Sequence, residues 1–186
     1  MLEKILELDK NVFVFLYNLG SAPFDGIWLI ITKQKYWTPF FIFVFYLFQK
    51  KLGWKNLGYF LLFIAFLIVI SDQTSSFFKN HFLRLRPYYD SQFSAIIRSL
   101  KHKPGQYSFF SGHATNSMAT TVFAFMILKR YYNHTYWLFL FPIIFAYSRI
   151  YLGLHFPTDI ITGYIFGATY GFVCYKIYVK YVLKTS

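Results

Sequence analysis

The chain has 186 residues, of which 56% are hydrophobic, 25% aromatic and only 14% charged, with a mean hydropathy of +0.40. This composition excludes an ordinary soluble domain and indicates a single-domain membrane protein that covers residues 1–186. The formal net charge of +12 suits an anionic membrane surface or a phosphate-bearing substrate, and the absence of any nucleic-acid-binding motif argues against nucleic acid as a partner.

The N-terminal region contains two short apolar stretches, residues 12–19 and 27–31. A helix needs about 20 mostly apolar residues to cross the hydrocarbon core, so each stretch is too short on its own. We expect an interfacial or re-entrant helix here, or parts of a sixth membrane span. The acidic residues Glu3, Glu7 and Asp9 argue against a cleaved signal peptide.

Longer apolar stretches follow, and each predicts a transmembrane helix. They are residues 36–48, 57–78, 118–128, 137–147 and 160–183. The predicted fold class is therefore all-α: a polytopic transmembrane helix bundle of five to six spans with an N-terminal interfacial or re-entrant helix. No internal repeat or flexible linker interrupts it.

The basic residues that flank these spans predict the orientation in the membrane. In a five-span chain the following residues share one side: Lys50, Lys51, Lys55, Lys129, Arg130, Lys176, Lys180 and Lys184. The positive-inside rule makes that side cytoplasmic, so segments 79–110 and 149–159 face outward. The outer side also carries Arg84, Arg98, Lys101 and Lys103, which would bind either substrate head groups or anionic lipid.

Three further cations on the outer side have the chemistry to bind phosphate. Lys79 and Arg86 bracket the end of a span in the stretch KNHFLRLRP, and Arg149 follows another span in SRIYLGLHFPTD. Arginine offers a planar fork of donors to anionic oxygens, and lysine offers a point charge. Alternating membrane topology would bring these segments to one end of the bundle.

The stretch SFFSGHATNS adds the start of a helix to this group. Ser111 and Gly112 precede an apolar segment, so their backbone N–H groups would be unpaired and the helix dipole would favour an anion there. Glycine allows an oxygen to approach closely. His113 would then lie in the first turn, at the rim of the anion site.

A second helix start carries a histidine and a carboxylate. Pro157 fits the first turn of a helix, which places His155 just before the helix and Asp159 inside the first turn. The carboxylate could accept a hydrogen bond from one ring nitrogen of His155 and leave the other nitrogen free to attack phosphorus. His113 could protonate the departing oxygen, and a bell-shaped pH profile is then expected.

These motifs resemble the signature of the type 2 phosphatidic acid phosphatase family, the integral membrane lipid phosphate phosphatases. The resemblance spans residues 79–159, and one position differs because the family usually has proline where this chain has Phe110. In chain order the motifs are Lys79 with Arg86-Pro87, Ser111-Gly112-His113, and Ser148-Arg149 with His155 and Asp159.

The resemblance implies a role for each residue and a metal-independent reaction without a cofactor. His155 would form a phosphohistidine, Asp159 would support it, and His113 would be the acid. The substrate oxygens would be held by Lys79, Arg86, Ser111, Gly112 and Arg149. For a bacterial-type enzyme the expected location is the inner (cytoplasmic) membrane with the active site facing the periplasm or the outside.

The expected substrate is a membrane lipid phosphate whose chain stays in the bilayer. Undecaprenyl diphosphate, phosphatidylglycerol phosphate, phosphatidic acid and a phosphate of lipid A all remain open, and the sequence does not indicate an oligomeric state.

Other readings also remain open. The protein could bind or transport a lipid phosphate without cleaving it, it could be a relative of the vanadate-dependent haloperoxidases, or His113, His155 and Asp159 could form a metal site. Asp72 interrupts an apolar span on the same helical face as Lys79. It would either pair with a cation of the motifs or make an ordinary polar contact between helices.

Overall fold

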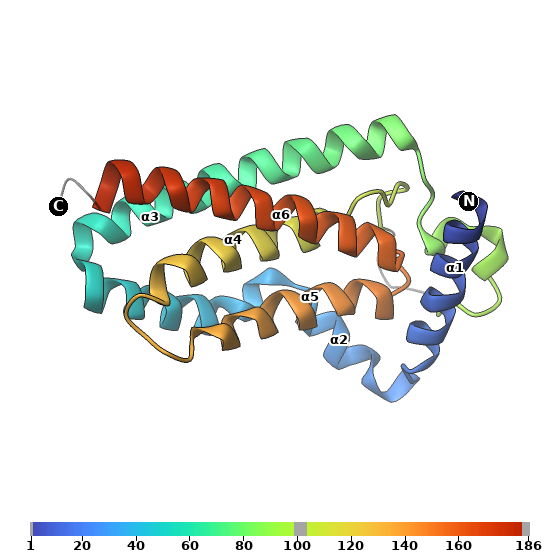
Figure 1. Cartoon of the computed structure of the whole chain (residues 1–186). Helices are drawn as coiled ribbons and strands as arrows, with labels where there is room; N and C mark the ends of the chain where they lie inside the picture. The colour runs from blue at the N-terminus through green and yellow to red at the C-terminus, as the bar shows by residue number, and fades with distance from the viewer. Residues whose placement is uncertain (1, 99–103, 184–186) are drawn as a thin grey trace.

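The computed structural model describes residues 2–98 and 104–183 as an all-helical chain (Figure 1). Within these ranges there is no β-strand, only an isolated bridge between Leu85 and Tyr107, so the predicted all-α class is confirmed. The α-helices are α1 (Leu2–Asn18), α2 (Asp25–Ile31), α3 (Thr38–Phe82), α4 (Gly112–Leu128), α5 (Leu140–Tyr151) and α6 (Pro157–Tyr178). Short helical turns are η1 (Ala22–Phe24), η2 (Gln34–Trp37), η3 (Pro87–Tyr89), η4 (Ser91–Phe93), η5 (Thr135–Phe139) and the π-turn η6 (Val179–Leu183).

Helix α3 consists of two helical halves separated at Gly53. This residue has φ 75° and ψ 173°, a backbone conformation that residues other than glycine rarely adopt. Figure 1 shows the chain reversing its direction at this break, so the two halves lie on opposite sides of the bundle. The two predicted spans at 36–48 and 57–78 therefore correspond to separate helical halves.

The centre of the bundle is formed by α4 against α6. Gly163 and Gly167 of α6 face the backbone of α4 so closely that a Cβ atom at Gly163 would lie 2.8 Å from the carbonyl oxygen of Ser111, and one at Gly167 would lie 2.5 Å from that of Thr115. Small residues at four-residue spacing allow such close approach of two helices in membranes. The contact fixes the beginning of α4 beside the first turns of α6.

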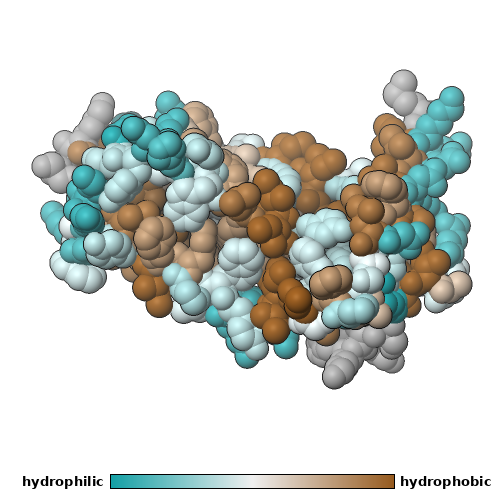
Figure 2. Space-filling view, turned by 90° about the horizontal axis from the view of Figure 1, so that it is seen from below, coloured by the Kyte–Doolittle hydropathy of each residue, from teal (hydrophilic) through white to brown (hydrophobic). Residues whose placement is uncertain are grey.

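Two helical segments are long and apolar enough to cross a membrane, Gln34–Phe82 and Pro157–Leu183. The segments Glu3–Asn18 and Ala22–Ile31 are bent by 81° and would form a third crossing only as a broken span or re-entrant loop, as the N-terminal stretches suggested. Helices α4 and α5 have only 17 and 12 residues, so the count of five to six spans goes beyond what length and composition establish. Figure 2 shows apolar side chains across the middle of one face and hydrophilic side chains at its two ends.

The two ends of the bundle differ in what they carry. One end holds the break in α3, the connection from α4 to α5 and the end of α6, and its basic residues are Lys50, Lys51, Lys55, Lys129, Arg130, Lys176 and Lys180 (Figure 1). The opposite end holds α1, the connection from α3 to α4 and the turn before α6. Lys101, Lys103 and Lys184 lie outside the described residues.

Candidate active site

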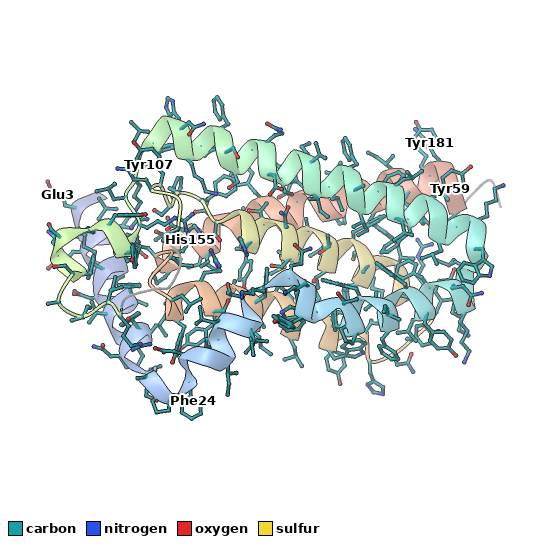
Figure 3. The ribbon with its side chains drawn as sticks, turned by 180° about the vertical axis from the view of Figure 1, so that it is seen from behind. Glu3, Phe24, Tyr59, Tyr107, His155 and Tyr181 are labelled. Carbon is teal, nitrogen blue, oxygen red and sulfur yellow. The ribbon has the colours of Figure 1, made fainter. Side chains whose placement is uncertain are left out.

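The three sequence motifs meet at the end of the bundle that holds α1 and the turn before α6. Figure 3 shows His155 within this end, on the side where Glu3 and Tyr107 lie, while Tyr59 and Tyr181 mark the far end. Arg86 follows α3, Ser111 precedes α4, Arg149 lies in the last turn of α5, and His155 precedes α6. Segments that are up to 70 residues apart are thus brought together, as the alternating topology predicted.

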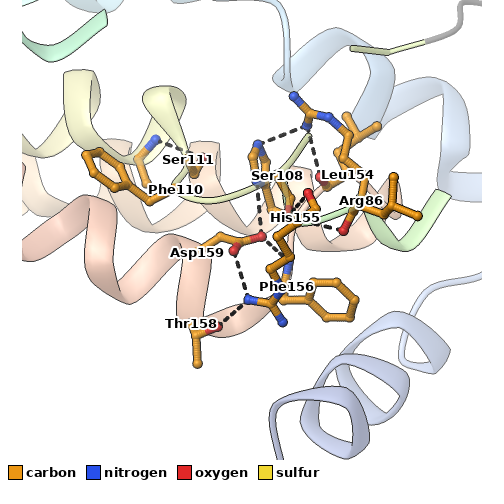
Figure 4. Close-up of polar contacts among 12 residues, drawn as sticks. Arg86, Ser108, Phe110, Ser111, Leu154, His155, Phe156, Thr158 and Asp159 are labelled. Carbon is orange, nitrogen blue, oxygen red and sulfur yellow. Dashed lines mark hydrogen bonds and ion pairs between the residues drawn. The ribbon is translucent and has the colours of Figure 1, made fainter. Parts of the chain in front are cut away.

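His155 is held on both ring nitrogens and is only 1% exposed. Its Nδ1 lies 3.3 Å from Oδ2 of Asp159, and its Nε2 lies 3.0 Å from Nη1 of Arg86 (Figure 4). A guanidinium can only donate, so Nε2 accepts and the ring proton is on Nδ1, where it is donated to the carboxylate. The predicted hydrogen bond between His155 and Asp159 is therefore confirmed.

Asp159 is fully buried in the first turn of α6, and each of its oxygens has a partner. Oδ2 also accepts from the backbone N–H of Phe156 at 2.9 Å, and Oδ1 accepts from Nη1 of Arg84 at 3.0 Å. Pro157 begins the helix, as predicted. The positive end of the helix dipole and the guanidinium both favour the ionised carboxylate at this position.

Arg84 links the site to the N-terminal helix. Its Nη2 lies 2.6 Å from Oδ2 of Asp9, while Oδ1 of Asp9 accepts from the N–H of Thr158 at 2.8 Å. The expectation that Arg84 binds head groups or surface lipid is wrong, because its guanidinium is committed to two carboxylates. The signal that was missed is a pattern in α1: Asp9, Phe13 and Tyr17 recur at four-residue spacing and all three are buried.

Arg98 has a structural role as well. Its Nε lies 3.0 Å from Oδ2 of Asp25, and its guanidinium lies over the rings of Tyr17 and Tyr151. The expected contact with head groups or surface lipid is therefore wrong here too. The guanidinium instead connects the chain after η4 to α1, α2 and α5.

The charges of the three motif cations act on the imidazole of His155. Burial lowers the pKa of His155 well below its ordinary 6.5, and the charges of Arg86, Arg149 and Lys79 lower it further. Arg86 is fixed by the carbonyl oxygens of Gly105 and Leu154. His155 is therefore neutral at neutral pH, as a nucleophile requires.

Arg149 has one buried donor to spare. Its Nη1 donates to the hydroxyl of Thr32, whereas its Nε is buried without a hydrogen-bond partner among the residues that the structure describes. Buried guanidinium groups are normally satisfied, so an unpaired N–H beside His155 is suited to an anionic oxygen of a ligand.

The start of α4 contributes fewer free N–H groups than predicted. Ser111 precedes the helix as expected and its Oγ accepts from the N–H of Ala114. Its own N–H, however, donates to the carbonyl oxygen of Asp159 at 3.1 Å, so it is not available to a ligand. The N–H groups of Gly112 and His113 remain at the beginning of the helix, and both residues line a cavity.

His113 is positioned by an aromatic side chain that the sequence did not reveal. Its ring stacks on Phe145 of α5 with a centroid distance of 5.3 Å and an interplanar angle of 27°. Both rings line the same cavity. Burial and the nearby charges, first of all that of Arg149, lower the pKa of His113 well below 6.5.

That cavity has a volume of about 440 Å³ and changes in character along its length. Near the helix start its wall is polar, formed by Asp72, Lys79, Gly112, His113, Asn116, Ser117, Thr120 and Thr121. Farther in, its wall is apolar and includes Phe40, Val44, Phe60, Ile64, Ile68, Ala124, Leu138 and Phe141. Its volume is typical of a ligand-binding cavity.

Asp72 makes a polar contact between helices. Its Oδ1 accepts from Nδ2 of Asn116 on α4 at 2.8 Å. In residues 2–98 and 104–183 it forms no ion pair with Lys79 or with any other cation, so the hypothesis of a direct pair with a motif cation is wrong.

A metal site built from His113, His155 and Asp159 is not supported either. Within the described part of the chain no three histidine, cysteine or acidic side chains form a group that could hold a metal ion.

Comparison with known proteins identifies the family of this site. The family model described as the PAP2 superfamily matches residues 57–182. The chain belongs to the PAP2 superfamily. A lipid A 4'-phosphatase of Porphyromonas gingivalis is 35% identical over 181 residues, which cover 95% of this chain and 75% of that protein. This PAP2 protein is a lipid phosphate phosphatase and, with its apolar helices, an integral membrane protein.

Two further proteins extend the comparison. An undecaprenyl-diphosphatase of Sulfolobus acidocaldarius is 26% identical over 182 residues, covering 94% of this chain and 81% of that protein. A transmembrane PAP2-type phosphatidylglycerolphosphate phosphatase from Bacillus subtilis has the same fold, with a TM-score of 0.70 at 16% identity over 96% of this chain and 88% of the other.

The link from α1 to Asp159 predicts a remote effect on turnover. Asp9→Asn should lower kcat about tenfold with little change in KM, because Arg84 would lose a buried charged partner and Asp159 would be held less firmly. The free energy of unfolding should fall by about 3 kcal/mol. Steady-state kinetics and thermal unfolding of the purified protein measure both.

The matched control is Asp25→Asn, because the pair of Asp25 and Arg98 also ties the N-terminal region down but does not contact Asp159. That pair is partly exposed, so its loss should cost less than about 1 kcal/mol. Equal kinetic effects of the two substitutions would contradict a specific role of Asp9.

The lowered pKa of His155 predicts the acid limb of the pH profile. A nucleophilic imidazole must be neutral, and the pKa of His155 lies below 6.5, so protonation of a nucleophile at this position would stop the reaction only at a lower pH than for an ordinary histidine. The acid limb of kcat/KM should therefore lie below pH 6.5. A profile that already declines on acidification from pH 8 to 7 would contradict this assignment.

Proposed function

We propose that the protein hydrolyses the phosphate or diphosphate group of a membrane lipid through a phosphohistidine intermediate, without a metal ion or cofactor. The observation that carries this proposal is the orientation of His155: its Nε2 lone pair faces the cations while Asp159 fixes the proton on Nδ1. We place the protein in a bacterial inner membrane, with the basic end of the bundle in the cytoplasm and the site facing the periplasm or the outside.

In the first step Nε2 of His155 attacks phosphorus while the bond to the lipid oxygen breaks. His113 donates a proton to that oxygen, and the phosphoryl group remains on His155. Burial and the neighbouring cations lower the pKa of His113 in the free protein, so His113 takes up this proton only when the anionic phosphate has entered the site. In the structure without substrate, Arg86 donates a hydrogen bond to Nε2 of His155. An entering phosphate would accept this hydrogen bond in place of Nε2 as its phosphorus approaches the nitrogen. Lys79, Arg149 and the N–H groups at the start of α4 would hold the remaining oxygens.

In the second step water attacks the phosphohistidine. His113, left neutral by the first step, accepts a proton from the water, the bond between phosphorus and Nε2 breaks, and inorganic phosphate leaves. Asp159 stays ionised throughout and stabilises the positive imidazole ring that forms when Nε2 bears phosphorus. Both histidines return to their starting states.

The leading substrate is lipid A bearing a phosphate. The 35% identity with a lipid A 4'-phosphatase over 95% of this chain supports this choice. A second candidate is undecaprenyl diphosphate, which the more distant undecaprenyl-diphosphatase supports at 26% identity. In either case the apolar part of the cavity offers a lipid chain a place between α3, α4 and α5, next to the phosphate site.

The reaction class is tested by phosphate release from purified lipid phosphates in detergent. Lipid A, undecaprenyl diphosphate, phosphatidylglycerol phosphate and phosphatidic acid form the panel, and each is run with and without a chelator. His155→Ala should lower kcat on the order of 10³-fold or more, since it removes the nucleophile. Activity should persist in the chelator.

The control is His134→Ala, an exposed histidine at the other end of the bundle, which should leave turnover unchanged. If His155→Ala still released phosphate at a wild-type rate, or if wild type released none from any lipid, the proposed function would be refuted.

The apolar part of the cavity predicts a dependence on chain length. Ala124→Phe would fill this part and displace two or three methylene groups of a bound chain, each worth about 0.8 kcal/mol. KM for a long-chain lipid phosphate should rise roughly tenfold or more, while a short-chain analogue should be little affected. An equal change for both substrates would contradict a chain in this cavity, and thermal unfolding shows whether the larger side chain disturbs the core.

A further inference from the structure

Arg149 differs from the other arginines at this end of the bundle in how it is held. Arg84 and Arg98 pair with carboxylates, and Arg86 donates to two backbone carbonyl oxygens. In the part of the chain that the structure describes, Arg149 forms no ion pair, and the hydroxyl of Thr32 accepts the one side-chain hydrogen bond of its guanidinium. The orientation of this guanidinium therefore depends on a single neutral partner.

Thr32 is placed beside Arg149 by the packing of α2 on α5 (Figure 1). Trp28 of α2 stacks on Tyr151 with a centroid distance of 5.0 Å and lies edge-on to Tyr147 at 5.1 Å. These tyrosines are two residues after and two residues before Arg149. Thr32 is four residues after Trp28 and directly follows α2 with helical dihedral angles, so both side chains lie on the face of α2 that meets α5.

The turn between α2 and η2 borders the same cavity as His113. Nε1 of Trp37 donates to the last carbonyl oxygen of α2 at 2.9 Å, which closes the turn that contains Thr32. The ring of Trp37 packs edge-on against Phe145, the side chain on which His113 stacks. Gln34, in the same turn, lines the cavity. The turn lies before residue 57, where the match to the family model begins, so the family motifs do not contain it.

A neutral partner can orient an arginine without using its charge. A carboxylate in the place of the Thr32 hydroxyl would hold the guanidinium firmly but would also neutralise it, and a phosphate would have to compete with that carboxylate. The hydroxyl accepts one hydrogen bond from Nη1 of Arg149 and leaves the positive charge uncompensated. The buried Nε–H, which has no partner among the described residues, is then suited to an anionic oxygen.

We propose that Thr32 is a positioning residue, which orients the guanidinium of Arg149 toward the oxygens of the substrate phosphate without neutralising it. The inference rests on the proposed function, because it takes a phosphate as the ligand of Arg149. It adds to the site a residue from outside the three motifs. Loss of the hydroxyl should weaken the binding of free phosphate as well as the turnover of a lipid phosphate, because both use the same guanidinium.

The test compares Thr32→Val, which keeps the shape of the side chain and removes the hydroxyl, with Thr32→Ser, which keeps the hydroxyl. Thr32→Val should raise the Kd for inorganic phosphate about tenfold and lower kcat/KM for a lipid phosphate by about tenfold or more, since a hydrogen bond to a charged group is lost. Thr32→Ser should stay within about twofold of wild type. The Kd follows from the rise of the unfolding temperature with phosphate concentration, and phosphate release gives kcat/KM.

Thr32→Asp tests the need for a neutral partner. Its carboxylate should pair with Arg149 and compete with the ligand, so inorganic phosphate should bind to this variant more weakly than to Thr32→Val. Wild-type affinity for phosphate in Thr32→Asp would show that the charge of Arg149 is not used and would overturn the proposal.

The matched control is Thr38→Val. Thr38 is six residues after Thr32 at the start of α3, donates its hydroxyl proton to the carbonyl oxygen of Lys35 at 2.7 Å, and does not line the cavity. This variant should keep the wild-type Kd for phosphate and the wild-type kcat/KM. Thermal unfolding of every variant without phosphate separates a loss of fold from a loss of anion binding.

Unchanged phosphate affinity and kcat/KM in Thr32→Val would overturn the proposal. A loss in Thr32→Ser as large as that in Thr32→Val would overturn it as well, because the hydroxyl would then not be the group that matters. If Thr32→Val failed to fold, the phosphate affinities of Thr32→Ser and Thr32→Asp would decide. If wild type released phosphate from no lipid, the proposed function would fail, whereas weaker phosphate binding by Thr32→Val would still support the orientation of Arg149 by Thr32.

Discussion

The site depends on one buried carboxylate, that of Asp159. A buried charge is stable only when charges and hydrogen-bond donors surround it, and here Arg84, His155 and the N–H of Phe156 provide them. The same contacts bring the end of α3, the turn before α6 and, through Asp9, the N-terminal helix to one point. The hydrogen bond from Nδ1 of His155, which helps to stabilise the ionised carboxylate, therefore also fixes the tautomer of His155.

The close contact of α4 and α6 adds the second half of the site. The small residues Gly163 and Gly167 let the two backbones approach until the N–H of Ser111 reaches the carbonyl oxygen of Asp159. This places the start of α4 beside the first turn of α6, directly after His155. A larger residue at Gly163 would separate the start of α4 from the first turn of α6 and from His155, so the helix packing also sets the geometry of the site.

The sequence predicted what depends on local spacing. Pro157 marked a helix start, and the four-residue spacing of His155 and Asp159 was enough to predict their hydrogen bond. The all-α class followed from apolar stretches, although short helices such as α5 left the number of spans unsettled. The contact of Arg84 with Asp9 could not be predicted, because it joins residues 75 apart whose meeting depends on how α1 folds back over the site. The partner of Asp72 was likewise set by the packing of α3 against α4.

The geometry also separates catalysis from simple binding of a lipid phosphate. Binding requires cations and helix N–H groups, and Arg149, whose buried Nε–H has no partner in the described part of the chain, would serve it. It does not require an imidazole buried to 1% exposure, whose burial lowers its pKa and whose proton is fixed away from the cations by a carboxylate. Such an arrangement costs desolvation of polar groups and contributes nothing to affinity alone. It does provide a neutral nitrogen whose lone pair faces Arg86, an arrangement that the proposed attack on phosphorus requires.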